Sequence, residues 1–136
     1  MPVKTHPTHR LIGVPFVDGG RDASGYDCWG LAQEVMRRYG HAVPDFSVSC
    51  FDTVLINALF EGERTKWLWL KTEAPEPGDL AVMNLDPLSP QMIQHVGVYV
   101  GDGRIIHTMR KRESHLVRID DPYWSKKIKA WYRWTG

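Results

Sequence analysis

The hydrophobic residues of this chain repeat with a helical period before residue 75 and with a strand-like period after it. Between Tyr26 and Tyr39 the apolar side chains recur at helical spacing and share one face. Gly40 follows this segment, and glycine commonly ends a helix as its C-cap. A second, weaker helical pattern covers residues 51–60. The sequence therefore predicts that helices occupy the first half of the chain.

After Pro75 and Pro77 the pattern changes to short runs of the kind that form strands. These runs cover residues 79–83, 94–100, 104–108, 115–119 and 127–134. Residues 101–103 read Gly-Asp-Gly, a turn signal that predicts a hairpin between two of the runs. Helices followed by strands favour an α+β domain, with N-terminal helices packed on a mostly antiparallel sheet of roughly five to six strands.

The composition is that of a folded protein and argues against several classes of partner. Hydrophobic residues make up 43% and charged residues 24% of the chain, which fits a single domain over residues 1–136. The net charge of +1 provides no strong field for nucleic acid or an anionic membrane.

No apolar run approaches the ~20 residues of a membrane span, so we expect no membrane insertion. Residues 1–10 lack the apolar core of a secretory signal. We therefore expect synthesis in the cytoplasm, and release through lysis, a secretion machine or a virus particle.

Cys28 is the candidate nucleophile. It lies near the start of the first predicted helix, where unpaired backbone N–H groups favour a thiolate. Asp27 has the opposite effect, because an adjacent carboxylate disfavours a second negative charge. On position alone, a buried structural cysteine is the more common situation. Cys50 is the only other cysteine, and two cysteines are too few for a disulfide framework, although a single bridge between them stays open.

His95 and His107 are the candidate partners of this thiol. His95 shares a strand face with Gly97, opposite the valines at alternate positions that form the core face. The predicted hairpin brings the His107 region close to His95. A thiol nucleophile needs an imidazole as base and a third group that orients the imidazole. In the absence of Cys28, two polar strand histidines would be the simpler interpretation. The remaining histidines have no assigned role: His6, His9, His41 and His115.

Three segments, taken in order, resemble the NlpC/P60 peptidases. Residues 13–31 contain Gly-Val-Pro-Phe, Gly-Gly and Gly-Tyr-Asp-Cys-Trp-Gly-Leu, residues 77–80 read Pro-Gly-Asp-Leu, and residues 95–107 form the histidine hairpin. The resemblance covers roughly residues 11 to 108 and is specific because the motifs are collinear. It implies a papain-like α+β fold and cleavage of peptidoglycan stem peptides between D-glutamate and a diamino acid.

The same resemblance assigns roles to individual residues. It implies that Cys28 is the nucleophile, His95 the base and His107 the orienting residue. It also implies that Asp27 holds the amine of the substrate. Trp29 stands where the family usually has serine, and Phe16 where it usually has a tyrosine that donates to the oxyanion. We expect both to border the substrate, and we expect the oxyanion to rely on backbone N–H groups, chiefly that of Cys28.

Cys-Trp-Gly-Leu at residues 28–31 is similar to the branch of the family found in phage and prophage tail proteins. We therefore expect a tail component that aids cell-wall penetration, with stem peptides and other phage tail proteins as partners. We expect no metal or other cofactor, since no three or four ligands have tetrahedral spacing. Two alternatives stay open. One is a catalytically idle structural tail or interaction protein, and the other is a related cysteine amidase or acyltransferase.

Overall fold

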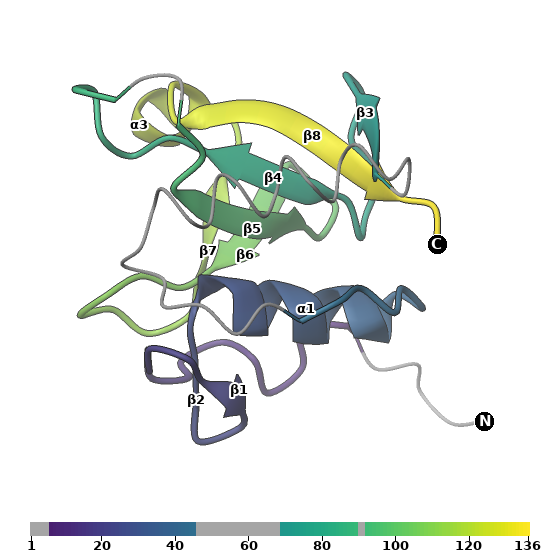
Figure 1. The fold of residues 1–136 in the computed structure, drawn as a ribbon, viewed down its shortest axis with the longest axis vertical. Helices are drawn as coiled ribbons and strands as arrows, with labels where there is room; N and C mark the ends of the chain where they lie inside the picture. Colours follow the sequence, from purple (N-terminus) through teal and green to yellow (C-terminus); the bar gives the residue numbers. More distant parts are fainter. Residues whose placement is uncertain (1–5, 46–68, 90–91) are drawn as a thin grey trace.

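The computed structural model describes residues 6–45, 69–89 and 92–136. Within these ranges a helix and a six-stranded antiparallel sheet form the body of the molecule (Figure 1). In chain order the elements are β1 Arg21–Asp22, β2 Gly25–Tyr26, α1 Cys28–Arg38, β3 Trp69–Thr72, β4 Leu80–Met83, β5 His95–Tyr99, β6 Arg104–His107, β7 His115–Arg118, α3 Pro122–Ser125 and β8 Ile128–Trp134. The weaker helix predicted at residues 51–60 lies outside the described residues, and so does Cys50.

Helix α1 begins at Cys28, two residues later than its apolar pattern suggested. Tyr26 instead pairs with Arg21 in the short hairpin of β1 and β2. Asp27 is the N-cap: its backbone is extended and its carboxylate accepts a hydrogen bond from the Gly30 N–H. The apolar side of the helix is buried against the sheet through Leu31, Ala32, Val35 and Met36.

The sheet has the strand order β3-β8-β4-β5-β6-β7. Five of its strands match the five predicted runs within one or two residues at each end, the usual precision of strand boundaries. Strand β3 was not predicted; it pairs along β8 with Trp69 opposite Trp134. The predicted hairpin joins β5 to β6 through the turn at residues 101–103. The α+β class and the antiparallel sheet are therefore confirmed.

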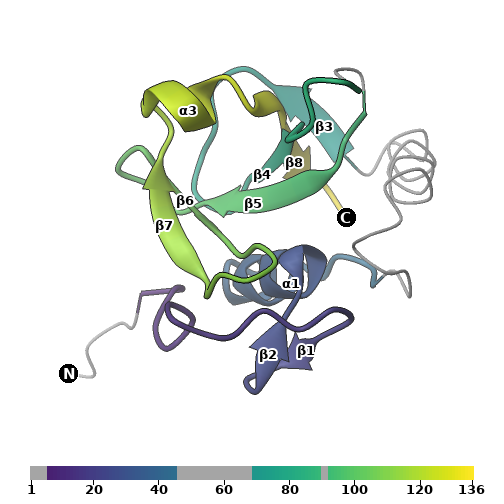
Figure 2. The ribbon, with the colours of Figure 1, turned by 90° about the vertical axis from the view of Figure 1, so that its left-hand side faces the viewer.

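Both faces of the curved sheet are covered (Figure 2). Helix α1 packs on the face that carries Val96 and Val98, as the alternation predicted. The opposite face holds a smaller apolar cluster that includes Met83, Ile105 and Trp124 of α3. The His95 face is consequently buried rather than open: His95 itself is 4% exposed. This second cluster places the two candidate histidines in an environment that disfavours charge.

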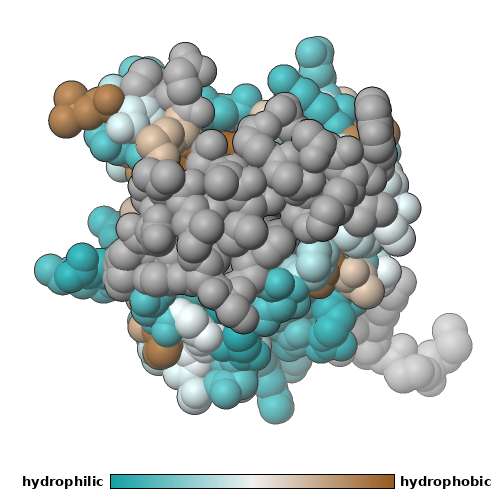
Figure 3. All heavy atoms as spheres, in the orientation of Figure 1, coloured by the Kyte–Doolittle hydropathy of each residue, from teal (hydrophilic) through white to brown (hydrophobic). Residues whose placement is uncertain are grey.

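The surface is largely polar over the N-terminal part of the fold. Figure 3 shows hydrophilic residues over the lower part of this face, where Figure 1 shows α1 and the hairpin of β1 and β2. Large hydrophobic side chains that are exposed lie on separate elements, at Ile12, Val17, Leu70, Leu88 and Tyr123. No helix in the described part of the chain has the length and apolar character needed to cross a membrane.

Candidate active site

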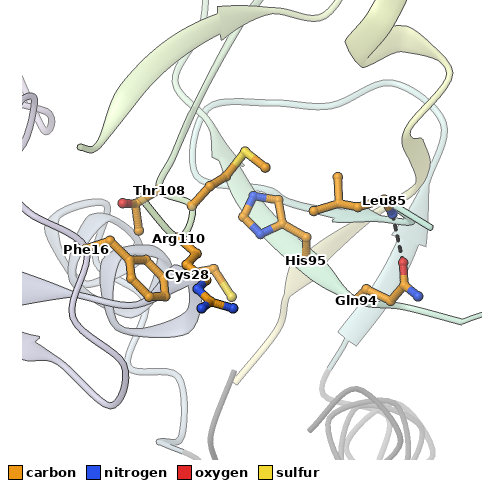
Figure 4. A pocket seen from close by; sticks show the side chains of 8 residues that line it. Phe16, Cys28, Leu85, Gln94, His95, Thr108 and Arg110 are labelled. Atoms are coloured by element: carbon orange, nitrogen blue, oxygen red, sulfur yellow. Dashed lines mark hydrogen bonds between the residues drawn. The ribbon is translucent and has the colours of Figure 1, made fainter. Parts of the chain in front are cut away.

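A cavity of about 240 Å³ lies where the start of α1 meets the start of β5 and the end of β6 (Figure 4). Its lining comes from segments far apart in the sequence: Phe16, Cys28, Leu85, Gln94, His95, Thr108, Met109 and Arg110. The predicted nucleophile and the predicted base therefore border the same space. In Figure 4 the imidazole of His95 and the side chain of Cys28 extend into the cavity from opposite sides.

Cys28 is the first residue of α1 and carries a free thiol. The loop before the helix packs closely on it, since a Cβ atom at Gly30 would collide with the carbonyl oxygen of Gly20. Burial, and then the charge of Asp27, raises the pKa of the Cys28 thiol to about 12. Burial therefore opposes the thiolate that the helix N-terminus favours.

Asp27 is also buried, with only 1% of its surface exposed. One carboxylate oxygen accepts from the Gly30 N–H at 2.7 Å and from an Nη atom of Arg21 at 2.7 Å. The other oxygen accepts from the Gly19 N–H at 3.0 Å. The carboxylate does not line the cavity. Its observed contacts hold the glycine-rich loop and the start of α1, so the structure gives no support to the expected contact with a substrate amine.

His95 and His107 form the contact that their hairpin suggested. Nε2 of His95 lies 2.8 Å from Nδ1 of His107, and both rings are buried. Val98 pairs with Ile106 across β5 and β6, and continuing that register by one residue places Gly97 opposite His107. His107 is then the diagonal neighbour of His95 on the same face of the sheet. This contact leaves Nδ1 of His95 as the ring nitrogen available to the cavity.

Packing holds the His107 ring from two further sides. The ring centroid lies 4.4 Å from that of His115, its partner across β6 and β7. The ring also makes an edge-to-face contact with Trp124, at 4.5 Å between centroids. Nε2 of His107 is buried without a hydrogen-bond partner among the described residues. His115 and Trp124 thus form the outer wall of the site. The sequence assigned no role to His115. Its position beside His107 follows from the pairing of β6 with β7.

Burial sets the protonation state of this group. Desolvation lowers the pKa of His95 to about 4, with a smaller contribution from His115. The pKa of His107 is lowered as well, first by burial and then by the nearby His95. Burial therefore favours the neutral forms of the Cys28 thiol and of both imidazoles at neutral pH.

The two remaining predicted substrate contacts lie in different places. Phe16 borders the cavity, as expected. Trp29 does not: its Nε1 donates to the carbonyl oxygen of Pro44 at 3.1 Å, and its ring contacts Trp69. Residue 29 lies one position beyond Cys28 on a helix, where successive side chains diverge by about 100°. The tryptophan in place of the family's serine accordingly packs away from the cavity.

Several cavity residues were not among the predicted site residues. Gln94 precedes the predicted base, and its Oε1 accepts from the backbone N–H groups of Leu85 and Asp86. Thr108 and Arg110 follow His107. Gln94 and Thr108 could have been inferred from their adjacency to the histidines. Arg110 belongs to a basic loop stretch that reads as solvent-exposed, and its place beside Cys28 depends on the tertiary fold.

Comparison with known proteins places these features in a family. The model of the NlpC/P60 family matches residues 13–133. A gamma-D-glutamyl-L-lysine dipeptidyl-peptidase of Bacillus cereus is 24% identical over 114 residues, which cover 82% of this chain and 30% of that protein. The probable endopeptidase YafL of Escherichia coli K12 is 27% identical over 124 residues, 90% of this chain and 45% of that protein. This chain thus spans less than half the length of either relative.

Solved structures of similar fold confirm the papain-like α+β architecture. NlpC2 of Trichomonas vaginalis superposes with a TM-score of 0.67 at 21% identity, covering 95% of this chain and 44% of that chain. The NlpC/p60 domain of the peptidoglycan hydrolase SagA superposes with a TM-score of 0.61 at 21% identity, covering 93% of this chain and 92% of that chain.

Proposed function

The chain belongs to the NlpC/P60 family, and we propose that it is a cysteine peptidase, with residues 1–136 as one catalytic domain, that hydrolyses the stem peptides of peptidoglycan. The observation that carries this proposal is the shared cavity of Cys28 and His95, with His107 in hydrogen-bond contact with His95. These are the nucleophile, base and orienting group that amide hydrolysis by a thiol requires.

In the proposed mechanism, the sulfur of Cys28 attacks the carbonyl carbon of the scissile amide while its proton passes to Nδ1 of His95. A C–S bond forms and the carbonyl oxygen takes the negative charge. When this intermediate collapses, the C–N bond breaks and the leaving amine receives the proton from His95. Water then attacks the thioester, and His95 accepts the proton of that water. When the second tetrahedral intermediate collapses, the C–S bond breaks and the carboxylic acid product leaves. His95 returns its proton to the sulfur, which restores the thiol of Cys28.

His107 supports this sequence by holding one tautomer of His95. Nδ1 of His95 accepts the thiol proton only if Nε2 carries the ring hydrogen, and that N–H then donates to Nδ1 of His107. The hydrogen of neutral His107 is consequently on its Nε2, in the apolar environment beside Trp124. The tetrahedral oxygen would be stabilised by the backbone N–H of Cys28, because the first N–H groups of a helix have no acceptor within the helix.

We further propose that the enzyme is an endopeptidase that cuts the bond between γ-D-glutamate and a diamino acid. We also propose that it acts as part of a phage or prophage tail. The relatives named as gamma-D-glutamyl-L-lysine dipeptidyl-peptidases support the bond type, and the Cys-Trp-Gly-Leu motif at residues 28–31 supports the tail setting. Digestion of purified peptidoglycan, followed by mass spectrometry of the products, tests the bond. New D-glutamate carboxyl ends paired with new diamino acid amines are the expected products. A product cut elsewhere would instead favour a related amidase or acyltransferase.

One observation favours a second candidate, a structural protein in which the chemistry is idle. Cys28 is only 9% exposed and burial raises its pKa to about 12, which is also the state of an inert structural cysteine. The two candidates differ in the effect of Cys28→Ala on peptidoglycan digestion. An active wild-type protein and an inactive variant with the same thermal unfolding would support the peptidase. Wild-type protein that releases no fragments from any peptidoglycan would support the structural role.

A further inference from the structure

The ring of His107 is held by a hydrogen bond at only one of its two nitrogens. Nδ1 contacts Nε2 of His95, whereas Nε2 is buried and has no hydrogen-bond partner among the described residues. The orientation of the ring on that side therefore depends on packing. In the described part of the chain this packing comes from the rings of His115 and Trp124. An indole does not take up a proton, so His115 is the packing partner that can change its charge.

His115 extends the contact between the two site histidines into a row of three imidazoles. It lies directly opposite His107 across β6 and β7, and their ring centroids are 4.4 Å apart. The centroids of His107 and His95 are 5.0 Å apart. His95 and His107 are buried, whereas His115 is half-buried on the edge strand of the sheet. This imidazole row therefore connects the base in the cavity with a ring that solvent can reach.

A local hydrogen bond fixes the neutral form of His115. Its Nδ1 lies 2.8 Å from the carbonyl oxygen of Glu113, which can only accept, so Nδ1 carries the ring hydrogen. The lone pair of the neutral ring is then on Nε2, and a proton from solvent adds at that atom. Histidine is the side chain that changes its charge between about pH 5 and pH 8. The outer end of the imidazole row can thus become positive while burial still favours neutral rings at its inner end.

The charged groups around the imidazole row reinforce a positive His115. Burial is the largest cause of the lowered pKa of His95 and of His107, and the charge of His115 adds to it for both residues. Arg112, a permanent cation on the loop after β6, acts on His107 in the same direction. Glu113 is the acidic residue of that loop, but it is exposed, so solvent screens its charge.

The other elements packed around the row bring no charge to it. Helix α3 contacts it through the uncharged Trp124. Residues 11–14, which are hydrogen-bonded to Ser114 beside His115, have uncharged side chains. The charge of His115 is therefore the variable part of the field on the two inner imidazoles.

We propose that His115 is a positioning residue that supports the ring of His107 while it is neutral and opposes the formation of imidazolium at His95 once it is protonated. This inference rests on the proposed peptidase function, in which His95 takes the proton of Cys28. That transfer creates a positive charge on His95, and a second positive charge in the same row raises the energy of this state. The site accordingly loses activity in mild acid, before His95 itself is protonated near its pKa of about 4.

The pH dependence of kcat/KM on peptidoglycan fragments tests this inference. His115→Phe keeps a flat ring beside His107 and removes the charge, whereas His115→Ala removes both. We expect the ratio of kcat/KM at pH 7.5 to that at pH 5 to be about tenfold smaller in His115→Phe than in the wild type, the order expected for one nearby charge. His115→Ala should show the same smaller ratio but a lower kcat at both pH values, with little change in KM, because His115 supports His107 and touches no substrate.

His41→Phe is the matched control. His41 is another half-buried histidine, just beyond the end of α1, and this variant should keep the wild-type ratio. If His115→Phe does not fold, His115→Gln carries the same expectation, because glutamine cannot take the charge either. A ratio in the uncharged variant equal to that of the wild type would overturn the inference, since His115 would then contribute packing alone.

Nitrogen-15 NMR of the histidine side chains provides a second measurement that does not need turnover. Neutral His115 should carry its hydrogen on Nδ1, and its titration should shift the signals of His107 and His95. In His115→Phe the pKa of His95 should be higher than in the wild type, because the neighbouring charge is gone. An unchanged titration of His95 would overturn the inference. If the wild-type protein cleaves no fragment but the His95 titration still moves, the proposed peptidase function fails while the electrostatic role of His115 stands.

Discussion

Nε2 of His95 and Nδ1 of His107 lie 2.8 Å apart inside the protein, and this contact assigns the two nitrogens of His95 to different tasks. One nitrogen is engaged by the neighbouring strand, and the other is left for the cavity that contains Cys28. The pair is buried beside a small apolar cluster, and this burial lowers the pKa of both imidazoles and favours their neutral forms.

The pH dependence of thiol labelling tests the protonation state of Cys28. Since the pKa of the buried thiol is raised to about 12, its alkylation rate should increase about tenfold per pH unit from pH 7 to pH 10. The Cys50→Ser protein restricts the signal to Cys28. An ordinary exposed thiol would approach a plateau above about pH 8.5. A rate already at its plateau near neutral pH would show that Cys28 and His95 form an ion pair instead.

Acid should destabilise the fold through His95. Its folded pKa of about 4 lies below the unfolded value of 6.5, so the unfolded chain binds more protons between these limits. The unfolding free energy is therefore at its full value above pH 6.5 and decreases as the pH falls towards 4, by about 3 kcal/mol for this group. Urea unfolding of the wild type and of His95→Asn across this range measures the effect. A wild-type protein whose unfolding free energy stayed level from pH 7 to pH 4 would argue against a buried neutral His95.

Substitutions of the three site residues should differ in severity. Cys28→Ala should abolish peptide cleavage with little change in unfolding temperature, and His95→Ala should be nearly as severe, because members of a catalytic unit fail together. His107→Ala should keep more activity, since in the proposed mechanism His107 orients the base without touching the substrate. His107→Asn should retain more than His107→Ala, because an amide can still accept from Nε2 of His95. If the His107 variants lost more activity than His95→Ala, the roles of base and orienting residue would have to be exchanged.

Asp27→Asn should weaken the fold and leave substrate choice unchanged. The variant loses the ion pair with Arg21 in a buried site, which we expect to reduce the unfolding free energy by roughly 1–3 kcal/mol. Peptides with free and with blocked N-termini should be affected to the same extent. Asp45→Asn is the matched control, because Asp45 is the more exposed partner of the same arginine and should change the unfolding free energy by less. A loss confined to peptides with a free amine would instead support the expected substrate-binding role of Asp27.

Much of the fold follows from local sequence pattern. Helix α1, its C-terminal limit and five of the six strands of the main sheet were predictable because apolar residues repeat with the period of each element. The hairpin between β5 and β6 was predictable from its turn residues, and with it the approach of His95 to His107. Strand β3 was missed because its four residues have no clear alternation of their own and take their conformation from β8.

The order of motifs along the chain was enough to nominate Cys28, His95 and His107, and the sequence by itself also determined the α+β class. The tertiary structure alone decided how those residues behave. Burial raises the pKa of Cys28 and lowers that of His95, and burial depends on segments distant in the chain, such as α3 against β6. The tertiary fold likewise pairs Asp27 with Arg21, joins Trp29 to the carbonyl oxygen of Pro44, and brings Arg110 to the cavity. Charge and solvation at a site arise from what surrounds it in space, which a pattern of neighbours along the chain does not specify.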